Sequence, residues 1–108
     1  MTKQIENIVN HAEVSEKSIE KYLVERVEAL GGMCLKYHNP NQIGFPDRIC
    51  LLPDGKVMWV ELKSRGEKLR TIQEIRFNQL ARLGQIVHVC DSKHAIDAIM
   101  EPLKQFRP

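Results

Sequence analysis

Apolar residues recur with helical spacing in the segment SEKSIEKYLVERVEALGG, residues 15–32. Five of them fall on one stripe of a helix: Ile19, Tyr22, Leu23, Val27 and Leu30. The stripe predicts a helix that Ser15 caps and Gly31 ends, because serine favours the first position of a helix and glycine the position just after it. Residues 1–14 lack a comparable period, and we expect a short helix or a loose arm there.

Four short apolar runs further along have the character of β-strands. They are MCLKYH (33–38), DRICLL (47–52), KVMWVELK (56–63) and QIVHVC (85–90). The Pro-Asp-Gly sequence between the second and third runs predicts a tight turn, which makes these two strands a hairpin. Helical spacing returns in residues 69–84 and after residue 90, where Asp91 or Ser92 is the expected cap and Pro102 the expected break.

The resulting order, α-β-β-β-α-β-α, predicts a mixed central sheet flanked by helices. The third and fourth strands are expected to be parallel, because a helix connects them. The 108 residues are a common length for one domain with one core. We therefore expect a single α/β domain over residues 15–101, preceded by the arm at 1–14 and followed by a tail at 102–108.

Composition places the chain among ordinary globular proteins, with 43% hydrophobic and 28% charged residues. No apolar run approaches the roughly 20 residues that span a bilayer. The opening residues MTKQIENIVN have neither the basic start nor the apolar centre of a signal peptide. These features favour a cytoplasmic protein.

Three cysteines, Cys34, Cys50 and Cys90, lie within the apolar strand-like runs. An odd number in a chain without a secretion signal favours reduced, buried thiols over a disulfide framework. Cys34 and His38 have the spacing of two zinc ligands, but no second closely spaced pair completes such a site. Zinc is therefore not expected.

The net charge of +2 conceals an uneven distribution of basic and acidic residues. Residues 1–35 carry four basic and six acidic side chains, whereas residues 36–82 carry nine basic and five acidic ones. The basic excess surrounds the predicted hairpin. A mild excess of this kind is often only a solvated surface, but beside a cluster of acids it favours a polyphosphate ligand.

Charged residues stand at the open end of the predicted hairpin. Asp47 and Glu61 are equally distant from Asp54 in the turn, so they should face each other, with Lys63 beside Glu61. Taken singly, Asp47 reads as a turn residue and Glu61 with Lys63 as an ion pair. Two adjacent carboxylates, however, repel unless one is protonated or a cation lies between them. The combination therefore favours a site for Mg²⁺ or Mn²⁺.

The segments GFPDRI and VMWVELKS also resemble a known nuclease signature. Pro46-Asp47 followed by Glu61-Leu62-Lys63 is similar to the PD-(D/E)XK motif, and residues 15–90 resemble the VRR-NUC family of that superfamily. The resemblance implies a restriction-endonuclease-like fold and a Mg²⁺- or Mn²⁺-dependent endonuclease. Asp47, Glu61 and the main-chain carbonyl of Leu62 would bind metal, and Lys63 would assist the attacking water.

The resemblance further implies a metal-binding glutamate on the first helix and a glutamine on the helix after the motif. Glu16 and Glu20 both flank the apolar stripe of the first helix. We favour Glu20, which precedes Gly31 by the spacing of related junction resolvases, with Glu16 as the rival or as a residue supporting it. Gln73 occupies the expected position in the later helix, where an ordinary first-turn residue is equally consistent.

Five basic residues near the motif are candidate contacts to DNA phosphates: Lys36, Arg48, Arg65, Lys68 and Arg70. The chain resembles phage-type members of the family, which implies a protein acting inside a bacterial host on branched DNA such as Holliday junctions. The approximate two-fold symmetry of a junction favours a homodimer, with Leu103 and Phe106 or the N-terminal arm as candidate contacts. A non-catalytic nucleic-acid-binding module with the same fold, or an RNA nuclease, remains open as an alternative.

Overall fold

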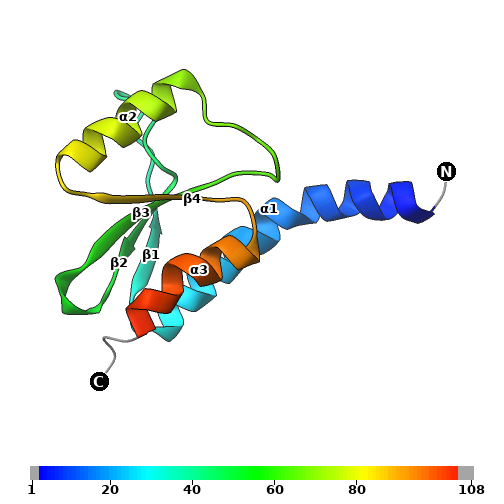
Figure 1. The fold of residues 1–108 in the computed structure, drawn as a ribbon, viewed down its shortest axis with the longest axis horizontal. Helices are drawn as coiled ribbons and strands as arrows, with labels where there is room; N and C mark the ends of the chain where they lie inside the picture. Colours follow the sequence, from blue (N-terminus) through cyan, green and yellow to red (C-terminus); the bar gives the residue numbers. More distant parts are fainter. Residues whose placement is uncertain (1–2, 105–108) are drawn as a thin grey trace.

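In the computed structural model, a four-stranded sheet and three helices form an α/β fold (Figure 1). The backbone is described for residues 3–104 and the side chains for residues 16–104. The elements are α1 (Lys3–Ala29), β1 (Met33–Lys36), β2 (Arg48–Leu51), the 3-10 turn η1 (Pro53–Gly55), β3 (Val57–Leu62), α2 (Thr71–Arg82), β4 (Ile86–Cys90) and α3 (Lys93–Lys104). The predicted order of helices and strands is confirmed.

The strands lie side by side in the order β1-β2-β3-β4. The pairs β1–β2 and β2–β3 are antiparallel, and β3–β4 is parallel, as the helical connection predicted. The hairpin closes at Pro53–Gly55, where Asp54 has a φ of 65° and Gly55 a φ of 73°. Aspartate and glycine are among the residues that adopt this left-handed conformation most readily, which explains why this sequence turns here.

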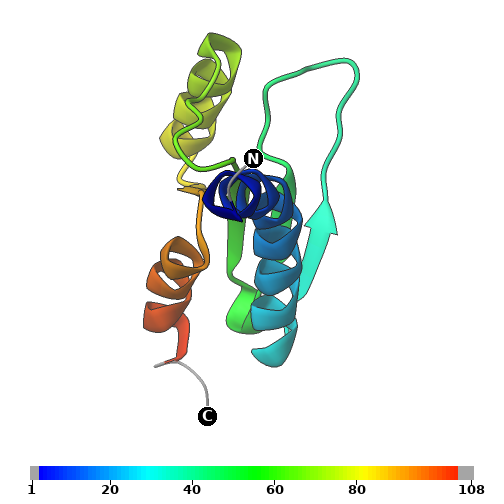
Figure 2. The same ribbon diagram turned by 90° about the vertical axis from the view of Figure 1, so that its right-hand side faces the viewer.

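The main core lies between one face of the sheet and the helices α1 and α3. Alternate residues of β3 face it, and its members are Ile19, Leu23, Val27, Cys50, Met58, Val60, Leu62, Cys90, Ile96 and Met100. In Figures 1 and 2, α2 lies on the other side of β4 from α3. Because side chains alternate along a strand, Glu61 points away from this core, toward the side of α2.

Two helix boundaries differ from the expectation. The first helix begins at Lys3, so the predicted cap at Ser15 is wrong: residues 3–29 contain no glycine or proline, and nothing in that sequence interrupts the helix. The last helix continues through Pro102 to Lys104, so the predicted break is also wrong. Pro102 removes one backbone hydrogen bond of α3 without ending the helix. Ser92 is the cap, because its Oγ accepts a hydrogen bond from the Ala95 N–H at 3.0 Å.

The first turns of α1 extend beyond the sheet in Figure 1. None of the described helices is both long and apolar enough to cross a membrane.

Candidate active site

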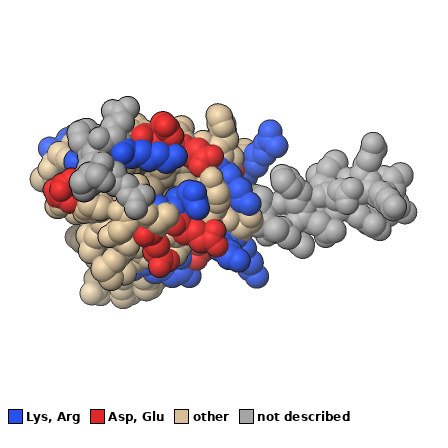
Figure 3. Space-filling view, turned by 90° about the horizontal axis from the view of Figure 1, so that it is seen from below, with Lys and Arg blue, Asp and Glu red and all other residues tan. Residues whose placement is uncertain are grey.

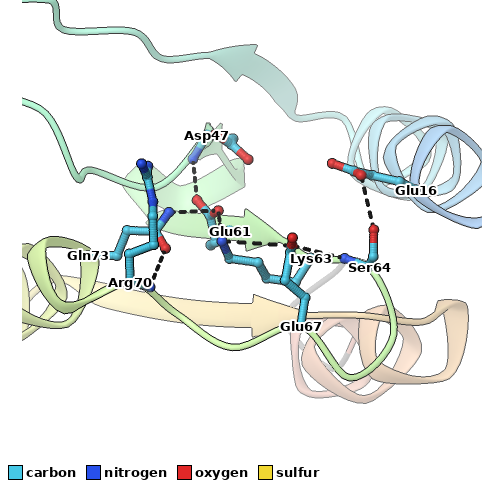
Figure 4. Close-up of polar contacts among 8 residues, drawn as sticks. All are labelled: Glu16, Asp47, Glu61, Lys63, Ser64, Glu67, Arg70 and Gln73. Atoms are coloured by element: carbon cyan, nitrogen blue, oxygen red, sulfur yellow. Dashed lines mark hydrogen bonds and ion pairs between the residues drawn. The ribbon is translucent and has the colours of Figure 1, made fainter.

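The open end of the β2–β3 hairpin brings Asp47 and Glu61 together. The paired residues Arg48 and Val60 end the ladder, and Asp47 and Glu61 occupy the next position on each strand. The Asp47 N–H donates a hydrogen bond to Glu61 Oε1 at 3.2 Å (Figure 4). On the other side, the Tyr37 N–H donates to the Asp47 carbonyl oxygen at 2.7 Å, which ties Asp47 to the end of β1 as well. The facing arrangement expected from the turn is therefore present.

Glu61 is an ionisable side chain that is only 3% exposed. Its Oε2 accepts a hydrogen bond from Gln73 Nε2 at 3.1 Å and lies 3.5 Å from Lys63 Nζ. Burial raises the pKa of Glu61, and the negative charge of Asp47 raises it further, while Lys63 opposes the shift. A cation beside these two carboxylates would relieve both unfavourable contributions.

The pKa of Asp47 is also raised. The main cause is loss of solvent around its carboxyl group, and the charges of Glu16 and Glu20 add to it, whereas Lys63 and Arg48 act in the opposite direction. In Figure 4 the carboxylates of Asp47 and Glu16 point toward one another across the site. Negative charge is thus concentrated here from three separate segments of the chain.

Lys63 is the basic group nearest to Glu61, and it is only 8% exposed. Its Nζ lies 3.5 Å from Glu61 Oε2 and 3.9 Å from Glu67 Oε1. The backbone N–H of Lys63 donates a hydrogen bond to the Cys90 carbonyl oxygen at 3.0 Å, which fixes the end of β3 against β4. The buried ammonium group of Lys63 needs the two carboxylates as partners, because an unpaired charge away from water is costly.

Gln73 links the start of α2 to Glu61. Its Oε1 accepts a hydrogen bond from the Arg70 N–H at 2.9 Å, and its Nε2 donates to Glu61. The Gln73 side chain is 4% exposed, and its hydrogen bond to Glu61 is shielded from water. Gln73 therefore fixes the orientation of the Glu61 carboxylate, which an ordinary exposed residue of a first helical turn would not do.

The two candidate glutamates of α1 have different partners. Glu16 Oε2 accepts a hydrogen bond from Ser64 Oγ at 3.2 Å, which brings its carboxylate to the segment that follows Lys63. Glu20 instead forms an ion pair with Arg48 and lies 3.7 Å from Lys36 Nζ. Glu16 therefore reaches the segment after the motif, whereas Glu20 is held against Arg48, and the choice of Glu20 as the metal-binding glutamate stays a prediction.

The candidate phosphate contacts divide into two groups. Arg48 is 8% exposed, and its guanidinium group contacts Glu20 and donates to the Cys34 carbonyl oxygen at 3.4 Å. It is not placed to contact DNA, because its position in β2 directs it against α1. Arg65, Lys68 and Arg70 are exposed along the connection from β3 to α2.

Lys36 is exposed as well, although its amine is near Glu20. Figure 3 shows basic and acidic side chains intermixed on the face seen from below the view of Figure 1. The basic excess expected from the sequence does not form a separate patch on that face.

The donor set of the site is made of hard oxygen atoms, the ligands that Mg²⁺ and Mn²⁺ prefer. Among side chains 16–104, no group of three or more His, Cys, Asp or Glu is arranged to hold a metal ion as it stands. Asp47 and Glu61 provide two adjacent carboxylates, and their raised pKa values indicate a place that favours added positive charge. The residues fit a divalent ion, with a movement of Glu16 needed for a third carboxylate.

Two contacts of the site were not anticipated from sequence. Ser64 holds Glu16, and Glu67 pairs with Lys63 while its Oε1 accepts a hydrogen bond from the Ser64 N–H at 3.4 Å. The spacing of Lys63 and Glu67 offers a weak signal only in a helix, whereas these residues lie in a loop. The contact between Ser64 and α1 has no sequence signal, because it joins residues 48 positions apart.

Comparisons of the sequence and the fold with known proteins show the family of this chain. The model of the VRR-NUC domain matches residues 3–94. A phage protein described as "Putative nuclease p44", from Acyrthosiphon pisum secondary endosymbiont phage 1, is 42% identical over 80 residues, which are 74% of this chain and 86% of that protein. A solved VRR_NUC domain superposes with a TM-score of 0.77 at 32% identity, over 81% of this chain and 95% of the other. The family model, the phage relative and the solved domain agree, and the chain belongs to the VRR-NUC family.

Proposed function

We propose that this protein is a Mg²⁺- or Mn²⁺-dependent endonuclease that hydrolyses phosphodiester bonds of DNA. The observation that carries the proposal is the buried Glu61, placed against Asp47 on one side and against Lys63 and Gln73 on the other. Membership of the VRR-NUC family and the similarity to a phage protein named as a nuclease support the same activity.

Each side chain of the site has a distinct task in this proposal. Asp47, Glu61 and the Leu62 carbonyl oxygen would hold the metal ion, which would neutralise charge that develops on the phosphate group. Lys63 holds positive charge beside the same position and is rigidly placed by Glu61 and Glu67. Gln73 keeps Glu61 oriented, and Ser64 presents Glu16 as the carboxylate from α1.

Glu20 has a supporting task rather than a metal-binding one. Its ion pair with Arg48 joins α1 to the first residue of β2, directly beside Asp47. This contact sets the position of α1, and therefore of Glu16, relative to the two carboxylates of the hairpin.

Branched DNA such as a Holliday junction is the substrate we propose, with a homodimer supplying two active sites. Leu103 packs against the core, so it is not free for the contact once expected of it, and Phe106 lies outside the described residues. The sheet face turned away from α1 offers exposed apolar side chains instead, at Met33, Leu35 and Leu51. β1 is an edge strand, and we propose that a second copy of the chain packs there and covers these side chains.

Cleavage of labelled nucleic acids tests the proposal and separates it from its alternatives. We expect junction DNA to be cut faster than a plain duplex or a flap with Mg²⁺ or Mn²⁺, and not in EDTA. Faster cleavage of single- or double-stranded RNA would favour the RNA nuclease. Binding of junctions without cleavage, equal for the wild type and Asp47→Asn, would favour the non-catalytic module.

A further inference from the structure

The strands β1 and β2 bring two thiols together on the core side of the sheet. Cys34 and Cys50 are directly opposite each other in the antiparallel register, and their Sγ atoms are 3.7 Å apart. Directly opposed residues on antiparallel strands have Cα atoms roughly 4.5–5.5 Å apart, which is within the span a disulfide bridges. The backbone therefore already satisfies the main geometric requirement for a bond between these two side chains.

The two thiols differ in access and in acidity. Cys34 is half-buried, whereas Cys50 has no exposed surface. The hydrogen bond that the Cys50 thiol donates lowers the pKa of Cys34, and the positive charge of Arg48 acts in the same direction. The same hydrogen bond and burial raise the pKa of Cys50. Cys34 is therefore the thiol that reacts first with a reagent from solution, because thiolate is the nucleophilic form.

We propose that Cys34 and Cys50 form a reversible dithiol–disulfide pair that joins β1 to β2. The oxidant is a small-molecule disulfide such as oxidised glutathione. The Cys34 thiolate attacks one sulfur of the disulfide and releases a thiolate, which leaves a mixed disulfide on Cys34. The Cys50 thiol then loses its proton and attacks Cys34 Sγ, which forms the Cys34–Cys50 bond and releases the second thiol. Two cysteines are oxidised, and one small disulfide is reduced to two thiols.

The bond would enclose the connection that carries Asp47. At the start of the β1–β2 connection, the Tyr37 N–H donates a hydrogen bond to the Asp47 carbonyl oxygen. Further along, the Ile43 carbonyl oxygen accepts a hydrogen bond from Arg76 Nε at 2.9 Å. Arg48 connects β1 to α1, since its guanidinium group donates a hydrogen bond to the Cys34 carbonyl oxygen and forms an ion pair with Glu20. Closing the loop between Cys34 and Cys50 restricts the unfolded chain and the local separation of β1 from β2. The inference does not depend on the proposed nuclease activity.

Thiol counting and mass spectrometry of the oxidised protein test the proposal. The chain has three cysteines, and after treatment with oxidised glutathione we expect one free thiol, Cys90. The mass should fall by two hydrogens, and a digest should contain a peptide that joins Cys34 to Cys50. Cys90 is fully buried with a pKa raised to about 11 by burial, so it serves as an internal control. A disulfide that includes Cys90, or a covalent dimer, would overturn the proposal.

Two variants separate the steps of the reaction. Cys50→Ser should stop at a stable glutathione adduct on Cys34, whereas Cys90→Ser should oxidise like the wild type. The oxidised wild type should melt at a temperature higher by on the order of 10 °C, and dithiothreitol should reverse the change. If a variant does not fold, the wild-type mass spectrum still decides: a lasting glutathione adduct without the internal bond, or no reaction at all, contradicts the proposal.

Discussion

The two ends of the β2–β3 hairpin differ in exposure and in the kind of side chain that they contain. The closed end, Pro53–Gly55, is exposed and is formed by backbone conformation, with a hydrogen bond from the Leu52 N–H to the Lys56 carbonyl oxygen at 2.8 Å. The open end buries charge. Among residues 16–104, the buried polar or charged side chains are Arg48, Glu61, Lys63 and Gln73, and all four are at or next to that end.

The closed end of the hairpin therefore stabilises the fold, whereas the open end destabilises it. The turn residues adopt conformations that suit them, so the closed end favours the fold locally. The open end places Glu61 away from water beside Asp47, and the raised pKa values of both groups show that their ionised forms are destabilised in the folded chain. Groups that weaken a fold in this way are typical of functional sites.

The largest expected effect is the loss of cleavage in Lys63→Ala. Removing this buried charge should reduce the rate of cleavage by about 10²–10³-fold, the range found when one electrostatic group of an active site is lost. Single-turnover cleavage of junction DNA measures it, with circular dichroism to establish folding. Lys104→Ala, an exposed lysine of α3 that pairs with Glu101, is the matched control and should cleave as the wild type does. Equal rates for wild type and Lys63→Ala would remove Lys63 from the mechanism.

Gln73→Ala should have the next largest effect. Loss of its hydrogen bond frees the Glu61 carboxylate, and residues that orient metal ligands usually contribute 10–100-fold to affinity or activity, so about that loss in Mn²⁺ affinity is expected. Titration calorimetry provides the measurement. Gln79→Ala changes an exposed glutamine of the same helix and should retain the wild-type affinity. A Gln73→Ala variant that binds Mn²⁺ normally would show that the hydrogen bond has a structural role only.

At the closed end, Gly55→Ala should affect stability alone. The open surroundings leave room for a Cβ atom, but the φ of 73° is strained for alanine, so a loss of about 1 kcal/mol in the free energy of unfolding is expected. Urea unfolding measures it, and Mn²⁺ affinity should not change. A change in affinity would mean that the two ends are coupled along the hairpin.

The smallest expected effect is a rise in the stability of the metal-free protein when Asp47 is made neutral. Since its pKa is raised in the folded chain, the folded state binds more protons than the unfolded state above the ordinary pKa, and stability falls as pH rises through that window. Asp47→Asn should therefore melt slightly higher than the wild type at neutral pH in EDTA, and the difference should vanish in acid. Asp54→Asn, the same substitution at the exposed closed end, is the control for the change of residue type itself.

The sequence was sufficient for the features that depend on local pattern. The apolar run of β3, the Pro-Asp-Gly turn and the motif residues predicted the hairpin, the order of elements along the chain and the meeting of Asp47 with Glu61. Helix ends were less predictable, because Ser15 is a good cap but nothing before it breaks the helix.

The side-chain contacts between α1 and the later segments were not predictable from the sequence. Arg48 looked like a DNA contact until its direction against α1 was known, and the choice between Glu16 and Glu20 depends on which partner each meets, Ser64 or Arg48. A spacing argument cannot decide this, since both residues lie one turn apart on the same side of the helix.

The position of a bound metal ion tests the central claim most directly. A crystal soaked in Mn²⁺ and measured near the manganese absorption edge should show an anomalous peak in contact with Asp47, Glu61 and the Leu62 carbonyl oxygen, and the peak should be lost in Asp47→Asn. Saturating Mn²⁺ with no peak at these residues, or a peak that persists unchanged in Asp47→Asn, would contradict the account.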